Sequence, residues 1–317
     1  MSVEFFKGLD AFPPVGERKA VVTVGTFDGI HRGHQEIFRR VKAVRDQGDY
    51  DAVMVTFHPH PRVIVTPDQI PMLLTSIEEK EQFVPDFFEG KVLVLDFDKK
   101  LRDMSAEQFV EEILVGRIGA RKLIVGYDHG FGRGREGSIP SLQLLGRRLG
   151  FDVEVVDPVF CGGKPVSSSR IRRAMSGGRY QEAIELLGHD YAIYGTVERG
   201  IGLGRKIGYP TANLKYNPRK LLPPQGVYAC WARVRGQDRD GMMFIGRNHF
   251  NPVHTITVEA NLFDFNDDIY NEELIVYPKE FVRNNHKFDS TETLIEQIGK
   301  DKKYIMSLIR KGEKQWQ

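Results

Sequence analysis

The sequence predicts two domains: an α/β domain with a doubly wound parallel sheet, then a small antiparallel β-barrel with a terminal helix. Three observations support this fold class. The chain has 317 residues, about twice a common domain length. Its first half alternates short apolar segments with helical patterns, and its second half consists of short β-rich segments separated by turns. The pattern changes near residue 187, so we expect domains at 1–186 and 187–317.

The first half contains five apolar segments of strand length, at 21–24, 52–57, 92–95, 122–125 and 153–156. Between the first two, Ile37, Phe38, Val41 and Val44 recur at helical spacing and form one apolar face. Another helix is expected to begin near Ser105, before the fourth segment. Strands that alternate with helices predict βαβ units and a parallel sheet.

The second half contains alternating segments at 192–197, 227–234, 255–263 and 273–277. Alternation with turn-rich separators is typical of a small antiparallel barrel. Residues 290–311 carry apolar side chains at helical spacing and predict a terminal helix.

Composition narrows the class of protein. Hydrophobic residues make up 41% and charged residues 28%, which excludes a disordered chain. The net charge of +2 gives no indication of a dedicated nucleic-acid or membrane binder. Only Cys161 and Cys230 occur, so we expect neither a disulfide framework nor a cysteine zinc site. With no apolar segment of spanning length and no signal-peptide pattern, we expect a cytoplasmic protein; its oligomeric state stays open.

A glycine-broken turn, GTFDGIHRGH at 25–34, connects the first strand to its helix. Gly25, Gly29 and Gly33 leave the backbone accessible to a phosphate chain, and the following helix N-terminus favours anions. His31 and His34 can then stabilise charge that develops during phosphoryl substitution. The alternative is a structural turn with surface histidines. This interpretation is the weaker one, because the segment lies between a strand and a helix.

Three further segments are candidates for ligand binding. VSSSRIRR at 166–173 offers hydroxyls with Arg170 and Arg172, either as a helix cap or as a polyphosphate clamp, and the residues alone do not decide. The glycine-rich loop 125–137 follows a strand, where open α/β sheets bind ligands. FHPHP at 57–61 also follows a strand and could form a rigid apolar lip, although histidines beside prolines are often only loop surface.

GTFDGIHRGH, FHPHP, GYDHxFGR and VSSSRIR, in this order, closely resemble the bacterial bifunctional riboflavin kinase/FMN adenylyltransferase (FAD synthetase) family. The resemblance extends over essentially the whole chain and implies a nucleotidylyltransferase-like first domain. It implies that His31 and His34 act on the reacting triphosphate. It also implies two sets of binding residues. The first, for ATP and its phosphates, is Gly25, Phe27, Asp28, Gly33, Ser168, Ser169 and Arg170. The second, for flavin, is Phe57, His58, Pro59 and Asp128.

The second half begins with a glycine-rich segment, GIGLGRKIGYPTAN at 200–213. Its glycines could form a flap over phosphates, and Thr211 and Asn213 offer the oxygen ligands that Mg²⁺ prefers. From these residues alone, a hairpin is the simpler interpretation of the glycine-rich part, and a turn is the simpler interpretation of PTAN. The segment resembles the riboflavin kinase motif, however, which implies that Gly202, Gly204 and Arg205 bind ATP. It further implies that Thr211 and Asn213 hold Mg²⁺ with ATP and that Glu259 is the general base.

Several positions depart from the family pattern. Ser169 stands where threonine is usual and Gly130 where a basic residue is frequent. In the second half the segment 244–250 lacks the usual Asn, Pro and Thr, Asn261 stands where histidine is common, Asn271 replaces a glycine and Asn285 replaces a glutamate. None of these departures removes Thr211, Asn213 or Glu259.

The resemblance implies a two-step enzyme with riboflavin, FMN and ATP as its small-molecule partners. The barrel would phosphorylate riboflavin to FMN, and the first domain would adenylylate FMN to FAD with release of pyrophosphate. The segment 244–250 keeps one alternative open, an FMN adenylyltransferase whose barrel binds flavin without efficient kinase turnover. The other alternative is a non-catalytic nucleotide- or RNA-binding module with a basic patch that includes Arg133, Arg135 and Arg170; the complete motifs around His31, His34 and Glu259 oppose it.

Overall fold

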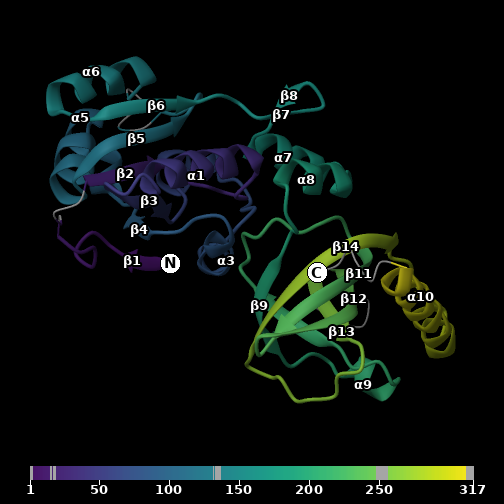
Figure 1. Cartoon of the computed structure of the whole chain (residues 1–317). Coiled ribbons are helices and arrows are strands. Elements are labelled where there is room, and N and C mark those ends of the chain that lie inside the picture. The colour runs from purple at the N-terminus through teal and green to yellow at the C-terminus, as the bar shows by residue number, and fades with distance from the viewer. Residues whose placement is uncertain are drawn as a thin grey trace. The chain divides into compact units, whose positions relative to one another are not determined.

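A computed structural model describes residues 3–14, 16, 19–130, 132, 137–247 and 256–311. The chain forms two compact units, residues 1–172 with 186–188, and residues 173–185 with 189–317. Each unit has its own sheet (Figure 1).

The first unit is built on a six-stranded parallel sheet in the order β1-β4-β3-β2-β5-β6. Its strands are β1 (Glu4–Lys7), β2 (Lys19–Val24), β3 (Tyr50–His58), β4 (Lys91–Asp96), β5 (Ala120–Gly126) and β6 (Asp152–Val156), followed by the hairpin β7 (Phe160–Cys161) and β8 (Lys164–Pro165). Its helices are α1 (Arg32–Arg45), α2 (Arg62–Val65), η1 (Pro67–Gln69), α3 (Ile77–Phe83), η2 (Val84–Asp86), α4 (Lys99–Asp103), α5 (Ala106–Gln108), the π-helix η3 (Phe109–Arg117) and α6 (Ile139–Leu149), while α7 (Ser168–Ser176) follows the hairpin. The predicted doubly wound parallel sheet is confirmed.

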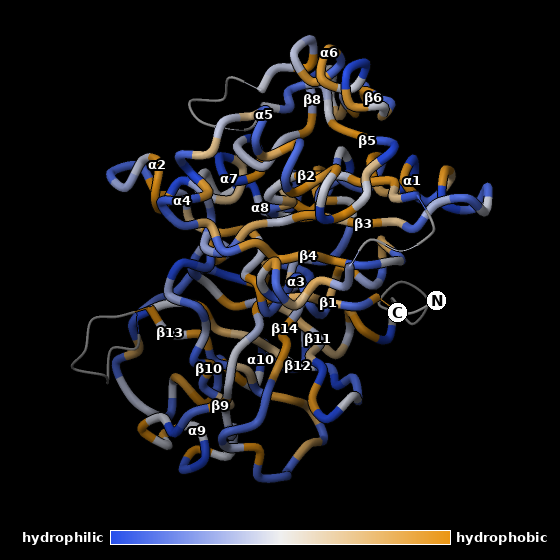
Figure 2. Tube along the Cα trace, turned by 90° about the vertical axis from the view of Figure 1, so that its left-hand side faces the viewer, coloured by the Kyte–Doolittle hydropathy of each residue, from blue (hydrophilic) through white to orange (hydrophobic). Residues whose placement is uncertain are grey.

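Both faces of this sheet are buried, because successive strand residues point to opposite sides. Val21 and Met54 pack against Phe38 of α1 on one face. Val22 and Val53 belong to the core on the other face, with residues of η3 and α6. Figure 2 shows the hydrophobic colour along β4 and β5. The continuous apolar runs in the sequence therefore reflect strands that are covered on both sides.

One helix of the first unit begins where the sequence predicts it, and one strand was not predicted. The helix expected near Ser105 begins there, and Ser105 forms a reciprocal capping box with Gln108. The sequence did not predict β1, a four-residue strand at the sheet edge that pairs in parallel with β4. A strand this short carries too little alternation to be recognised.

The second unit is a closed antiparallel barrel in the order β10-β13-β12-β11-β14-β9. Its strands are β9 (Ile193–Glu198), β10 (Ala212–Tyr216), β11 (Gly226–Val234), β12 (Gln237–Arg247), β13 (Ile256–Leu262) and β14 (Glu273–Arg283), and its helices are α8 (Tyr180–Leu187), α9 (Leu203–Lys206) and α10 (Thr291–Lys311). The predicted barrel and terminal helix are confirmed. Residue 255 of the expected third strand lies outside the described residues.

Helix α10 covers the barrel through an apolar cluster in which Ile305 is fully buried with Ala229 and Phe263. Strand β14 is longer than expected, since it continues past Tyr277 through Pro278 to Arg283. A register shift against β11 falls between Ala229 and Cys230, where Pro278 pairs with Cys230. An irregularity of this kind is where a strand tolerates proline, which donates no ladder hydrogen bond.

Candidate functional site

In the first unit the GTFDGIHRGH segment leaves the carboxyl end of β2, a central strand of the sheet. From β2 the chain proceeds to β3 and β4 on one side, and β5 and β6 lie on the other side. Open α/β sheets bind ligands at such a switch point, outside the carboxyl ends of the strands. His31 is the N-cap residue of α1, so the two histidines lie at this edge of the sheet.

The glycines of this turn are tightly packed. A Cβ at Gly29, where φ is +90°, would lie 2.9 Å from Cδ1 of Leu74. A Cβ at Gly25 would lie 3.1 Å from the Phe27 ring, and one at Gly33 would lie 3.2 Å from the His31 ring. Glycine is therefore needed at these positions because neighbouring protein groups occupy the space of a side chain. The proposed roles of these glycines in ATP binding stay predictions.

His31 and His34 are stacked on each other, with ring centroids 3.6 Å apart and planes inclined by 18°. Phe27 packs edge-on against the His34 ring at 5.2 Å. Burial lowers the pKa of His34 well below 6.5, and the neighbouring His31 and Lys80 lower it further. His34 is therefore a neutral imidazole at pH 7, able to donate one N–H to a phosphate oxygen.

A network of buried polar side chains holds the turn that carries His31 and His34 in place. Asp28 is 1% exposed, and its carboxylate accepts from the Thr75 backbone N–H at 2.8 Å. Lys80 of α3 is 6% exposed and donates from Nζ to the Thr26 carbonyl at 2.6 Å. Burial lowers the pKa of Lys80, and Asp28 opposes this shift. Thr75 and Lys80 were not predicted from the sequence; Lys80 stands in a Glu-Glu-Lys-Glu run typical of an exposed helix.

The VSSSRIR segment joins this network at the start of α7. The Ser168 hydroxyl donates to the Asp28 carbonyl at 2.8 Å, while Ser169 is exposed. Arg172 forms an ion pair with the Asp28 carboxylate and donates to the Met72 carbonyl at 2.8 Å. Two motifs 140 residues apart in sequence, around Asp28 and Ser168, are thus in direct contact.

The contacts of this segment support the capping interpretation, and the clamp interpretation of Arg170 stays a prediction. The Ser167 hydroxyl accepts from the backbone N–H of Arg170 at 3.3 Å, which is a capping contact. The Arg170 guanidinium donates through Nη1 to the carbonyls of Cys161 (2.8 Å) and Lys164 (3.0 Å). Arg170 therefore holds the β7–β8 hairpin beside the helix start.

The four expected flavin-binding residues lie at or just beyond the carboxyl ends of β3 and β5, the two strands that flank β2. Phe57 is half-buried and packs edge-on against Phe97 at 5.6 Å. His58 ends β3 and is exposed, as is Asp128 just beyond β5. Pro59 follows His58 directly. Because β2, β3 and β5 are parallel neighbours, these residues share one edge of the sheet with His31. In loop 125–137, Phe131 and residues 133–136, with Arg133 and Arg135, lie outside the described residues.

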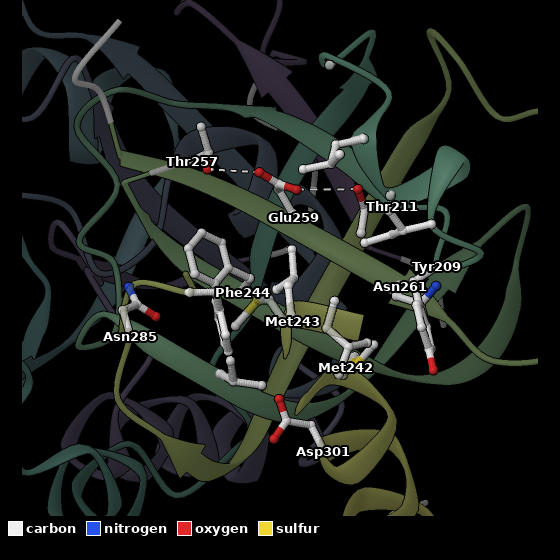
Figure 3. A pocket seen from close by; sticks show the side chains of 18 of the residues that line it. Tyr209, Thr211, Met242, Met243, Phe244, Thr257, Glu259, Asn261, Asn285 and Asp301 are labelled. Carbon is white, nitrogen blue, oxygen red and sulfur yellow. Dashed lines mark hydrogen bonds between the residues drawn. The ribbon is translucent and has the colours of Figure 1, made fainter. Parts of the chain in front are cut away.

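The second unit has a cavity of about 450 Å³ in and beside the barrel. Thr211, Asn213 and Glu259 all line it, as do Gly200, Gly202 and Gly204. Figure 3 shows Glu259 between Thr211 and Thr257. Three residues predicted for one reaction therefore meet in one cavity.

Glu259 is held at the centre of β13 by two hydroxyls. Thr211 Oγ1 donates to Oε2 at 3.3 Å, and Thr257 Oγ1 approaches Oε1 at 3.2 Å. Asn213 of β10 is the direct cross-strand partner of Glu259. The carboxylate thus lies beside the oxygen donors that could hold a metal ion.

The glycine-rich segment 200–204 continues into the short helix α9 rather than forming a hairpin. A Cβ at Gly200 would lie 2.5 Å from the Asn213 amide, and one at Gly204 would lie 2.3 Å from the Tyr209 carbonyl. Glycine is required here because the segment packs directly on the PTAN residues. Arg205 is exposed and does not line the cavity; its guanidinium lies 5.9 Å from the centre of the Tyr270 ring.

Several of the second-half residues that depart from the family pattern line the cavity. Phe244, Asn261 and Asn285 line it, whereas residues 248–250 of the segment 244–250 lie outside the described residues. Met242 and Met243 also line the cavity and were not predicted, because an apolar side chain in a strand gives no sign of a binding site. Asn271 has φ +63°, in the left-handed region that asparagine tolerates, which explains why it can replace the glycine of the family pattern.

A second cavity of about 450 Å³ lies near α6 and β6 and contains none of the predicted site residues. Across the described residues, no cluster of three or more His, Cys, Asp or Glu side chains could hold a metal ion. None of the helices in the described ranges is both long and apolar enough to cross a membrane.

Comparisons with known proteins identify both units. Residues 14–170 match the FAD synthetase family model, and residues 187–309 match the riboflavin kinase model. A bifunctional riboflavin kinase/FMN adenylyltransferase from Listeria monocytogenes is 34% identical over 297 residues, covering 92% of this chain and 93% of its own. Its Escherichia coli counterpart is 31% identical over 300 residues, covering 94% and 96%.

A solved structure extends the similarity to the fold. A crystal structure described as a macrolide-efflux protein from Streptococcus pneumoniae superposes with a TM-score of 0.83 and 30% identity, covering 96% of this chain and 99% of that one. The two family models and the relatives over nine-tenths of their length lead to the same assignment. The chain belongs to the bifunctional riboflavin kinase/FMN adenylyltransferase family.

Proposed function

We propose that the two reactions of this family are divided between residues 1–186 and residues 187–317. The chain phosphorylates riboflavin to FMN and adenylylates FMN to FAD. The first reaction belongs to the barrel and the second to the parallel-sheet unit. The observation that carries this division is the meeting of Thr211, Asn213 and Glu259 in one cavity of the second unit, whereas the histidine turn belongs to the first unit.

In the kinase reaction, Glu259 is the general base. Its carboxylate accepts the proton of the primary ribityl hydroxyl as that oxygen attacks the γ-phosphorus of ATP, and ADP leaves. The Thr211 and Thr257 hydroxyls hold the carboxylate in one orientation, which limits the reorganisation needed at the moment of transfer.

Magnesium fits the donor set beside Glu259. Thr211 and Asn213 offer neutral side-chain oxygens in the same cavity, and hard oxygen ligands suit Mg²⁺. We propose that these two residues hold Mg²⁺ when it is bound with ATP. The ion would then neutralise charge on the phosphates.

In the adenylyltransferase reaction, a phosphate oxygen of FMN attacks the α-phosphorus of ATP and pyrophosphate leaves. His31 and His34 lie at the switch point of the sheet, where they donate hydrogen bonds to the phosphate oxygens on which charge increases. Ser168, Ser169 and Arg170 bind the distal phosphates at the start of α7. Phe57, His58, Pro59 and Asp128 contact the flavin.

One experiment tests this function. The full chain is incubated with riboflavin, ATP and Mg²⁺, and riboflavin, FMN and FAD are separated by chromatography over time. We expect FMN to appear first and FAD to follow. FAD from supplied FMN, without any FMN from riboflavin, would contradict the kinase assignment.

A further inference from the structure

The Asn285 side chain leaves one hydrogen-bonding atom unused in the barrel cavity. Its amide Nδ2 donates to the Ile245 carbonyl at 3.0 Å. This contact fixes the orientation of the amide, because only the nitrogen can donate to a carbonyl. The other atom, Oδ1, is buried and has no hydrogen-bond partner in the part of the chain that the structure describes. Figure 3 shows Asn285 at one side of the cavity, with its oxygen turned toward the other side chains drawn.

The surroundings of this oxygen suit a flat apolar ligand. Val227, Met243 and Phe244 line the same cavity. Arg283 also lines it, but its guanidinium is engaged with the buried Asp301 carboxylate at 2.8 Å. A buried acceptor without a donor is unfavourable, so a ligand that brings an N–H to Oδ1 gains affinity.

The strand order indicates which substrate meets Asn285. Strand β13, which carries Glu259, lies between β10 and β12. On the β10 side, Asn213 is the cross-strand partner of Glu259, and Thr211 precedes it. On the β12 side the partner is Phe244, and the next residue, Ile245, holds Asn285. The groups for phosphate and metal therefore lie on one side of the base, and Asn285 lies on the side left for the phosphate acceptor.

We propose that Asn285 Oδ1 accepts a hydrogen bond from the imide N3–H of the flavin ring and so selects riboflavin by its pyrimidine edge. This inference rests on the proposed kinase function of the barrel. The oxidised isoalloxazine ring has a single N–H, at N3, between two carbonyl groups. Asn285 is thus a specificity-determining residue whose amide both fixes the chain to β12 and recognises the substrate.

The test compares riboflavin with N3-methylriboflavin as the phosphate acceptor of the full chain, using kcat/KM from initial rates of ADP release. We expect the unmodified protein to prefer riboflavin by about 10- to 100-fold, because the methyl group removes the donor. In Asn285→Ala the preference should fall to within about three-fold of unity, since the acceptor is gone and the methyl group has room.

Two further variants distinguish recognition of the flavin by Asn285 from a purely structural role of its amide. Asn261→Ala removes another cavity amide that donates to a backbone carbonyl, that of Pro210 at 2.6 Å, and should keep the preference. Asn285→Asp loses the donor to Ile245 but retains an acceptor, so it should also keep the preference and serves if the alanine variant does not fold. Equal use of both flavins by the unmodified protein, or an unchanged preference in Asn285→Ala, would overturn the proposal.

A third comparison distinguishes flavin from adenine as the ligand. If Asn285→Ala instead loses the preference for ATP over inosine triphosphate, which lacks the adenine amino group, Asn285 recognises the nucleotide and the proposal is wrong. Complete failure of the unmodified protein to phosphorylate riboflavin would overturn the kinase function itself, an outcome that is distinct from these.

Discussion

The Asp28 carboxylate and the Arg172 guanidinium form an ion pair in which the Asp28 side chain is 2% exposed and that of Arg172 is 18% exposed. Asp28 belongs to the histidine turn after β2, and Arg172 belongs to α7. The pair therefore fixes the turn that carries His31 to the helix whose start is expected to bind phosphates. The relative position of these two motifs depends on a buried charge pair.

Removal of Arg172 tests this link. Arg172→Gln should lower the free energy of unfolding by about 3–5 kcal/mol, because the Asp28 carboxylate stays buried without its partner. FAD formation from FMN should fall with it, while riboflavin phosphorylation by the barrel persists. Urea unfolding and initial rates measure both effects. Arg173→Gln, an exposed neighbour in the same helix, is the control and should change neither.

Arg170 tests the geometry of the β7–β8 hairpin. Arg170→Ala should slow FAD formation by about 10- to 100-fold and leave FMN formation unchanged, because the hairpin loses its two hydrogen bonds to Nη1 and the proposed phosphate site loses a guanidinium. Arg170→Lys should recover only part of the rate, since a single ammonium does not reproduce the guanidinium geometry. Full activity in the lysine variant would show that charge alone matters. Initial rates with supplied FMN decide between these results.

The lowered pKa of His34 predicts a pH dependence of stability. The unfolded chain binds a proton at His34 near pH 6.5, whereas the folded chain resists it, so the unfolded state holds more protons below that pH. The free energy of unfolding should therefore fall as the pH drops below about 6.5, by at most about 1.4 kcal/mol per pH unit from this residue. Urea unfolding between pH 7.5 and 5.5 measures the slope. In His34→Gln the slope should be smaller; an identical slope would refute the assignment.

The donor set beside Glu259 predicts how metal is bound. Thr211 and Asn213 supply too few ligands to hold Mg²⁺ permanently by protein side chains alone, so Mg²⁺ should bind together with ATP. Elemental analysis of nucleotide-free protein should find no stoichiometric ion, and kinase activity should require added Mg²⁺. Tightly bound zinc in the purified protein would contradict this account.

The fold class could be predicted because its signals are local. Val21 to Val24 and the other apolar runs indicated strands, and Ile37 to Val44 indicated a helix with one apolar face. The structure shows that both faces of the sheet are covered and that this helix packs on one of them. Strand β12 was missed because it begins with the charged run Gln237 to Asp240, which pairs with Arg233 and its neighbours on β11. Pairing with a neighbouring strand, rather than local alternation, determines that element.

The candidate site was predictable only where residues form short motifs. His31, His34, Thr211 and Asn213 stand in compact strings, and Glu259 could be assigned through the resemblance to the family. Lys80 and Asn285 acquire their significance from contacts with the Thr26 and Ile245 carbonyls, which lie 54 and 40 positions away in the chain. No local pattern marks a buried lysine, and Asn285 stood out in the sequence only as a departure from the family pattern, so the contacts of both residues required the structure.

The division of the two reactions between the units is the central claim, and two substitutions measured on both reactions test it most directly. Initial rates are taken from riboflavin and, separately, from supplied FMN, because loss of a base costs about 10² to 10⁴ in rate and endpoints would hide it. His31→Ala should abolish FAD formation while riboflavin accumulates as FMN. Glu259→Gln should leave riboflavin unconverted and still form FAD from FMN at the unmodified rate. If Glu259→Gln slows FAD formation from FMN as strongly as it slows FMN formation, the two reactions share one site and the account is contradicted.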